Sequence, residues 1–242
     1  MTINYHKPVK LNDFVHCYIW QGMGNNCNTI VFTNILKGEH PHVIIDPGHV
    51  ENEAREPCYN SLEQAMAKDD IKVVDIGLII NTHSHPDHCE ANEYIIEKSG
   101  AGVTLSREED EFRTTVGEQL CAMFGLKTPQ YKPLFYLKEG NLDLGKDGIQ
   151  VQVIFTPGHS PGSVCLYLPI QKILITGDVI FSMSVGRTDF PGGNIRQLKN
   201  SIDRLSSLDI EYLVPGHNTE PNGIIEGKDK VQRNFEMVQM YF

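Results

Sequence analysis

The segment NTHSHPDHCE, residues 81–90, places four groups that can bind a metal within six consecutive positions: His83, His85, Asp87 and His88. It follows an apolar run, residues 76–82, that predicts a buried strand. His83 and His85 are two residues apart, so they point to the same side of an extended chain, and Pro86 then turns the backbone as a helix begins. Imidazole nitrogen and carboxylate oxygen suit zinc, iron or manganese. The segment therefore predicts a metal site.

Three further apolar segments end on a residue of the same kind. They are residues 153–159 (VIFTPGH), 172–178 (KILITGD) and 211–217 (EYLVPGH), which close on His159, Asp178 and His217. The glycine before each of these residues allows a tight turn beside a crowded site. Because catalytic groups usually lie on loops at strand ends, we expect seven candidate ligands to gather at one edge of a sheet sandwich. The other histidines are interpreted as surface or structural residues: His6, His16, His40, His42 and His49.

Strands and helices alternate along the chain. Apolar, β-branched segments predict strands at residues 14–20, 28–35, 42–49, 76–82, 149–156, 163–169, 172–178 and 210–217. Helices are predicted from Ser61, over 89–100, from Ser106 to residue 125, over 194–208 and in the tail. Ser61 with Gln64, and Ser106 with Glu109, have the spacing of a capping box. No low-complexity segment or break in composition marks a linker, so we expect one domain spanning residues 1–242.

Composition limits the functions to consider. The 242 residues carry a formal net charge of −10, which argues against binding to nucleic acid or an anionic membrane. No apolar run approaches the ~18 residues of a membrane span, and the first ten residues contain no apolar core of a secretory signal. The six cysteines form no CxxC pair. We therefore expect reduced thiols in a cytoplasmic protein.

Four motifs together resemble the signature motifs of the metallo-β-lactamase superfamily, in the same order and over nearly the full chain: THSHPDH (82–88), TPGHSPGS (156–163), TGDVIF (176–181) and VPGH (214–217). The resemblance implies an α/β fold, the four-layer αββα sandwich, with a dinuclear metal site at the sheet edges. The ligands that it implies are His83, His85 and His159 for the first metal and Asp87, His88 and His217 for the second, with Asp178 bridging them. Asp46, in IIDPG, matches the family's buried aspartate, which supports the ligand loop from behind.

The branch of the superfamily is narrowed by two residues. Asp178 stands where one subclass of zinc β-lactamases has cysteine, and His85 stands where diiron flavoproteins have glutamate, so both branches are disfavoured.

Residues 186–194 (GRTDFPGGN) resemble a segment of glyoxalase II-like hydrolases and persulfide dioxygenases. The C-terminal helical domain with which glyoxalase II helps to bind glutathione has no counterpart in the 25 residues after His217. Arg187 matches a glutathione-contacting basic residue, and its alternative role is an ion pair, for example with Asp189.

The predicted function is metal-dependent hydrolysis of a thioester, as in glyoxalase II, or of a related ester or lactone. A water that bridges two divalent cations loses its proton near neutral pH and attacks the carbonyl. Asp87 and Asp178 are the candidates for orienting this nucleophile while also binding metal. Zinc is the favoured metal, with iron and manganese as alternatives. We expect a small-molecule substrate and neither nucleic-acid nor membrane partners; a mononuclear-iron persulfide dioxygenase and a nuclease or phosphodiesterase remain the alternative functions.

Overall fold

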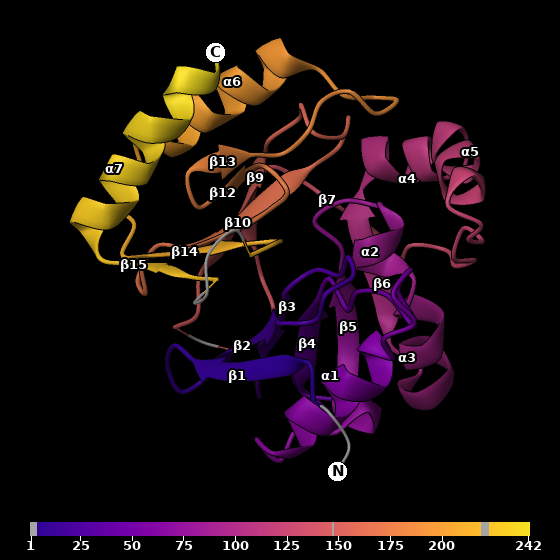
Figure 1. Cartoon of the computed structure of the whole chain (residues 1–242). Coiled ribbons are helices and arrows are strands. Elements are labelled where there is room, and N and C mark those ends of the chain that lie inside the picture. The colour runs from indigo at the N-terminus through magenta and orange to yellow at the C-terminus, as the bar shows by residue number, and fades with distance from the viewer. Residues whose placement is uncertain (1–3, 147, 219–222) are drawn as a thin grey trace.

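The computed structural model describes residues 4–146, 148–218 and 223–242, and two β-sheets form its centre (Figure 1). The first sheet runs in the order β1 (His6–Lys10), β2 (Val15–Trp20), β3 (Thr29–Phe32), β4 (His42–Ile45), β5 (Ile76–Ile80), β6 (Gly102–Ser106) and β7 (Phe135–Leu137). The second runs in the order β15 (Ile225–Glu226), β14 (Tyr212–Pro215), β11 (Ile173–Gly177), β10 (Val164–Leu168), β9 (Val151–Phe155) and β8 (Gly140–Leu142). A short hairpin of β12 (Ile180–Phe181) and β13 (Ser184–Val185) follows β11.

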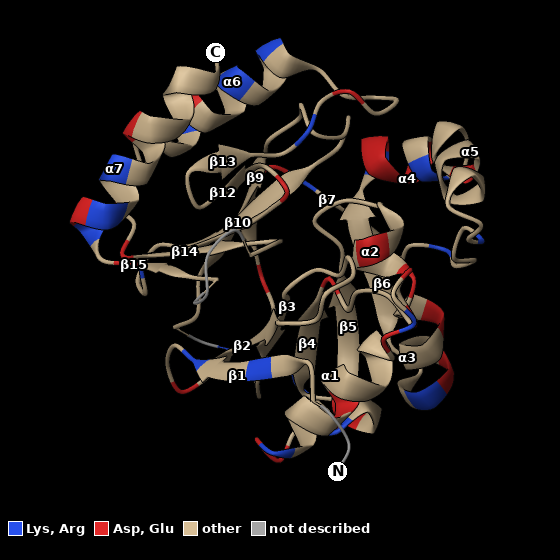
Figure 2. Ribbon diagram, in the orientation of Figure 1, with Lys and Arg blue, Asp and Glu red and all other residues tan. Residues whose placement is uncertain are grey.

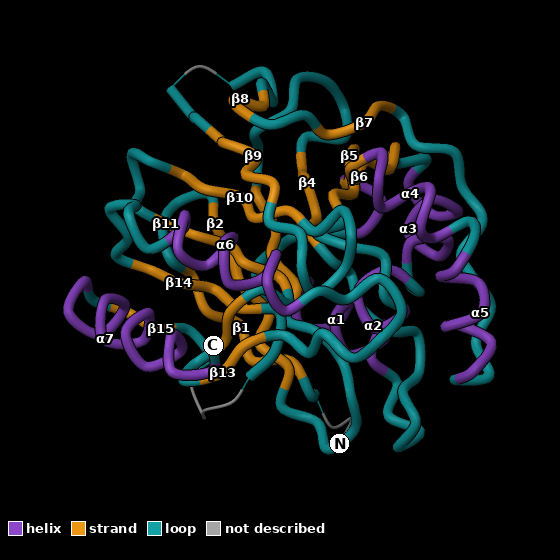
Figure 3. The backbone as a smooth tube through the Cα atoms, turned by 90° about the horizontal axis from the view of Figure 1, so that it is seen from above, coloured by secondary structure: helices purple, strands orange, loops and turns teal. Residues whose placement is uncertain are grey.

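Helices cover the outer face of each sheet. The helices α1 (Cys58–Ala67) and α3 (Asn92–Ser99) lie against the first sheet, and α6 (Ile195–Leu205) and α7 (Lys228–Val238) lie against the second (Figures 1 and 3). The short helices α2 (Pro86–Cys89), α4 (Arg107–Arg113) and α5 (Val116–Met123) follow β5 and β6, and the 3-10 turns η1 (Val73–Asp75) and η2 (Gln239–Tyr241) complete the elements of the described chain. Lys, Arg, Asp and Glu lie mainly on the helices and loops (Figure 2).

Three apolar clusters separate four layers. The middle cluster joins the inner faces of the two sheets, for example Ile45 of β4 and Ile175 of β11. A second cluster packs the outer face of the first sheet against α1 and α3, and a third packs the second sheet against α6 and α7. Side chains alternate between the faces of a strand, so in β4 Val43 and Ile45 enter the middle cluster while Ile44 enters the helix-facing one. The predicted αββα sandwich is confirmed.

Two local predictions were wrong. The helix α1 begins at Cys58, not at Ser61, because the Ser61 hydroxyl instead accepts the main-chain N–H groups of Tyr5 and His6. The helix predicted from Ser106 to residue 125 is broken into α4 and α5 at Thr114–Thr115, whose hydroxyls donate to main-chain carbonyls one turn earlier. The helix predicted over 194–208 is present as α6, with Leu198, Ile202 and Leu205 buried and Ile195, at its first turn, 45% exposed.

The cysteines are free thiols, and all six are buried. Within the described parts of the chain, no helix has the length and apolar character needed to cross a membrane.

Candidate metal centre

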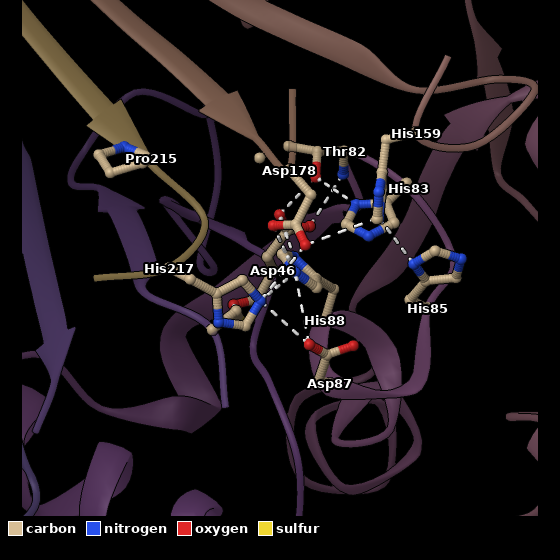
Figure 4. Close-up of polar contacts among 12 residues, drawn as sticks. Asp46, Thr82, His83, His85, Asp87, His88, His159, Asp178, Pro215 and His217 are labelled. Carbon is tan, nitrogen blue, oxygen red and sulfur yellow. Dashed lines mark hydrogen bonds and ion pairs between the residues drawn. The ribbon is translucent and has the colours of Figure 1, made fainter. Parts of the chain in front are cut away.

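The candidate ligands lie at the carboxyl ends of strands from both sheets (Figure 4). His83 to His88 follow β5, and Asp46 follows β4, its parallel neighbour in the first sheet. In the second sheet Asp178 follows β11, and His217 follows β14, which is parallel to it. His159 follows β9, which runs in the same direction because both β9 and β11 are antiparallel to β10. The strand ends therefore bring to one edge residues that are up to 171 positions apart, from Asp46 to His217.

A first group consists of His83, His85 and His159, all of them buried. Their ligand atoms lie within 4.8 Å of one another, and the Nε2 atom of His159 is 2.8 Å from Nδ1 of His85. The Nε2 atom of His83 is buried and has no hydrogen-bond partner among the described residues. A buried polar atom without a hydrogen-bond partner lowers stability. The position of this nitrogen is therefore better explained by a role as a metal ligand than by packing of the His83 ring alone.

A second group consists of Asp87, His88, Asp178 and His217, whose ligand atoms also lie within 4.8 Å of one another. His217 Nε2 is 3.0 Å from Asp87 Oδ2 and 3.2 Å from His88 Nε2. Asp178 contacts both groups, because its Oδ1 lies 3.1 Å from His88 Nε2 and its Oδ2 lies 3.6 Å from His159 Nε2. This placement is the one that a residue bridging two metals needs.

The two groups differ in charge. Burial lowers the pKa of His85 to about 3, and the neighbouring His159 lowers it as well, so His85 is neutral and has a free lone pair. Burial alone would raise the pKa of Asp178, but the facing His217 and His88 hold that pKa well below its usual range. Burial opposes protonation of His217, yet Asp178 and Asp87 raise its pKa to about 10. The second group thus holds ionised carboxylates beside a protonated His217, and a bound cation would take the place of that proton.

Two residues outside the ligand groups, Asp46 and Arg187, orient ligand side chains through hydrogen bonds to their Nδ1 atoms. Asp46 is buried, and its Oδ1 accepts the N–H of Thr82 at 2.8 Å while its Oδ2 lies 2.9 Å from His88 Nδ1. The Nδ1 atom of His159 lies 2.8 Å from the main-chain carbonyl oxygen of Arg187. A histidine whose Nδ1–H donates in this way keeps Nε2 as its free lone pair, which is the usual arrangement of a metal-binding imidazole.

The glycines before the ligands leave no room for a side chain. A Cβ atom at Gly158 would overlap the main-chain nitrogen of Leu198, and the φ angle of Gly158 is +143°. A Cβ atom at Gly216 would overlap Oδ1 of Asp178. Gly158 is therefore required where the end of β9 approaches α6, and Gly216 where the ends of β11 and β14 approach each other, in agreement with the predicted tight turns.

A pocket of about 810 Å³ opens over both groups. One wall is apolar and contains Leu120, Phe124, Leu126 and Phe190. The Phe190 ring centroid lies 6.1 Å from that of Phe124 and 6.0 Å from the imidazole of His85, so this wall reaches the first group. Residues 49–55 contribute a polar part of the lining, with His49, Glu51, Glu53 and Arg55.

Neither arginine of the pocket lining is free of an acidic partner. Arg187 donates to both carboxylate oxygens of Asp189, at 2.8 and 2.7 Å, and its guanidinium carbon lies 3.9 Å from the centre of the Phe190 ring. The ion pair that the sequence offered as the alternative role of Arg187 is thus present. Arg55 is paired with Glu51 at 3.1 Å.

Sequence reasoning missed several residues of this site. Asn25 donates from Nδ2 to Asp87 Oδ2 at 2.9 Å, although it lies in a polar loop with no ligand-like spacing. His49, interpreted as a surface or structural residue, is buried in the pocket lining with its Nδ1 2.7 Å from Glu90. Its position directly after the IIDPG motif was the one signal that could have identified it.

Comparisons with known proteins agree with this geometry. The family model described as the Metallo-beta-lactamase superfamily matches residues 23–217. The probable metallo-hydrolase MJ0888 of Methanocaldococcus jannaschii is 35% identical over 182 residues, which cover 73% of this chain and 82% of that protein. Hydroxyacylglutathione hydrolase GloC of Haemophilus influenzae is 29% identical over 189 residues, which cover 76% of this chain and 84% of that protein.

A solved structure agrees over almost the whole chain. The crystal structure of TTHA1623 in a di-iron-bound form aligns with 94% of this chain and 98% of that chain, with a TM-score of 0.67 and 27% sequence identity. The fold, the order of the strand-end motifs and the match of the family model lead to one conclusion: the chain belongs to the metallo-beta-lactamase superfamily.

Proposed function

We propose that this protein is a dinuclear metal-dependent hydrolase that cleaves thioesters or closely related esters. The observation that carries the proposal is the pair of adjacent ligand groups, which Asp178 connects by contacting both and five members of which line one pocket. In this proposal His83, His85 and His159 hold one cation, Asp87, His88 and His217 hold the other, and Asp178 contacts both. A structural zinc site is closed by four ligands, so seven clustered candidate ligands, five of which line a pocket, support catalysis instead.

Divalent cations in such a site polarise a carbonyl oxygen and lower the pKa of a coordinated water from 15.7 to about 7. Zinc is the metal we favour, while the di-iron form of TTHA1623 keeps iron as an alternative. The chain itself supplies orientation. Asp87, whose Oδ2 lies 3.0 Å from His217 and 2.9 Å from Asn25, is held where a carboxylate can accept a proton from an attacking water.

The pocket walls support a substrate with an apolar group. Phe124 and Phe190 offer an aromatic surface beside His85, suited to an acyl or thiol portion that carries a ring or a branched chain. Both arginines of the lining are already paired with carboxylates, so neither is available to hold a substrate carboxylate without giving up its partner. We therefore expect an uncharged apolar thioester to be cleaved more efficiently than the corresponding glutathione thioester, even though GloC is named as a hydroxyacylglutathione hydrolase.

The decisive experiment combines metal analysis with a thioester assay. Purified protein is analysed for zinc, iron and manganese, and release of thiol from S-benzoyl-N-acetylcysteamine is followed with a chromogenic thiol reagent. We expect about two transition-metal ions per chain and activity that a chelator abolishes and added Zn²⁺ restores. His83→Ala should lose metal and activity together, whereas His40→Ala, on an exposed side chain, should lose neither.

Other outcomes point to the alternative functions. One iron per chain with consumption of dioxygen in the presence of a persulfide would replace the hydrolase with an oxygenase. Cleavage of RNA or of a phosphodiester, with no cleavage of any thioester, would point to the nuclease branch.

A further inference from the structure

The side chain of Glu109 is diverted away from the helix that its sequence motif predicts it to cap. In a capping box the residue in the position of Glu109 would accept the main-chain N–H of Ser106. Only the other half of the box is present: the Ser106 hydroxyl accepts the N–H of Glu109 at 3.1 Å. The Glu109 carboxylate is completely buried instead, in contact with the two loops that carry His85 and His159.

Each carboxylate oxygen of Glu109 serves one ligand loop. Its Oε1 accepts the N–H of Ser84 at 2.9 Å and the hydroxyl of Ser84 at 2.8 Å, and Ser84 lies between His83 and His85. Its Oε2 accepts the hydroxyl of Ser160 at 2.8 Å and the N–H of Gly162 at 2.9 Å, and Ser160 follows His159. The same dipeptide, His–Ser, thus occurs in both loops, and both serines bond to the same carboxylate.

We infer that Glu109 is a positioning residue that couples the two loops and sets the distance between His85 and His159 for the first metal. The inference rests on the proposed metal site. His85 and His159 come from different sheets, and their ligand nitrogens lie 2.8 Å apart. The Glu109 side chain forms hydrogen bonds with both loops at once. Loss of its carboxylate would therefore let the two loops move relative to each other.

The chemistry of the four donors requires a carboxylate. One main-chain N–H faces each oxygen, and a main-chain N–H can only donate. A glutamine at this position would present an oxygen to one loop and an NH₂ group to the other. The serine hydroxyl on the side of the NH₂ group could rotate to accept from it. The main-chain N–H on that same side, of Ser84 or of Gly162, would still be buried without an acceptor.

The test compares Glu109→Gln with Glu108→Gln, a change of the same charge on the same helix at an exposed position. Metal-free protein is titrated with Zn²⁺ against a competing chelator, and both dissociation constants are measured together with the melting temperature of the metal-free form. We expect Glu109→Gln to weaken one of the two zinc sites by about 10- to 100-fold, with a smaller effect on the other. Glu108→Gln should leave both constants unchanged.

The outcomes separate this inference from the proposed function. If wild-type protein binds no zinc, the metal site itself fails before any variant is compared. If wild-type protein binds two zinc ions and Glu109→Gln binds both with unchanged constants while its metal-free form melts at a lower temperature, Glu109 only stabilises the fold and the positioning role is wrong. Ser160→Ala, which removes one hydroxyl and keeps every main-chain N–H partner, provides a milder variant should Glu109→Gln not fold, and unchanged zinc constants in Ser160→Ala would then count against the role.

Discussion

The imidazole of His159 and the main-chain carbonyl of Arg187 are in contact, with Nδ1 2.8 Å from the oxygen. The segment that follows Asp178 therefore acts on the first ligand group through its backbone, while the Arg187 side chain points to Asp189 and Phe190. Two functions of one residue are thereby separated: the carbonyl orients a candidate ligand, and the guanidinium forms part of the pocket wall.

Arg187→Ala should keep the backbone contact and remove only the side chain. We expect normal metal content, little change in the melting temperature because the ion pair is exposed, and a KM close to that of the wild type. Asp189→Asn is the matched variant, since it would release the guanidinium and should lower KM for a glutathione thioester. A large rise in KM in Arg187→Ala, with kcat and stability unchanged, would show instead that the guanidinium binds the substrate in the native protein.

Asp178→Asn should impair both ligand groups at once. The substitution keeps the shape of the side chain but removes the charge that faces His88, His159 and His217. We expect bound metal to fall from about two ions per chain towards one, and kcat to fall by about 100-fold or more. Elemental analysis and steady-state kinetics measure the two effects, with Asp203→Asn on the exposed face of α6 as the control. Retention of two metals and full activity would rule out a bridging role.

Phe124→Ala should change substrate preference without affecting the fold. Phe124 is 56% exposed and lies in the pocket wall, so its removal should lower kcat/KM for an S-benzoyl thioester by about tenfold and leave the S-acetyl thioester nearly unchanged. Met123→Ala is the control, because Met123 is 73% exposed and is absent from the pocket lining among the described residues. Equal losses of kcat/KM for both thioesters would mean that the aromatic wall does not discriminate between acyl groups.

His6 should make the protein less stable in mild acid. Burial lowers the pKa of His6 to about 3, from an ordinary value of 6.5. Below pH 6.5 the unfolded chain takes up a proton at His6 that the folded chain does not, so the free energy of unfolding falls by about 1.4 kcal/mol per pH unit from this residue until the pH approaches 3. Above pH 6.5 His6 has no such effect.

Urea unfolding of metal-free protein between pH 7.5 and 5 measures this slope. His6→Asn should reduce the slope by about one proton, and His40→Asn serves as the control on an exposed histidine. An unchanged slope in His6→Asn would mean that another group dominates the acid response.

Local spacing was sufficient to predict that the candidate ligands gather at one sheet edge. A ligand that directly follows an apolar strand must lie at that strand's end, and the two-residue period of a strand puts His83 and His85 on one side. The resemblance to the superfamily then predicted the four-layer sandwich and the partners of each ligand. The family model and the two sheets agree with the predicted sandwich.

The sequence by itself determined which side chains reach the sheet edge, whereas only the tertiary structure decided what the surrounding side chains do there. Ser61 and Glu109 both have capping-box spacing, yet Ser61 binds the N-terminal strand and Glu109 binds the two ligand loops. Their hydrogen-bond partners lie more than 20 residues away in the chain, at distances set by packing of separate layers. A capping motif specifies only what a side chain can bond within its own helix, and a buried carboxylate bonds to whichever donors packing brings within reach.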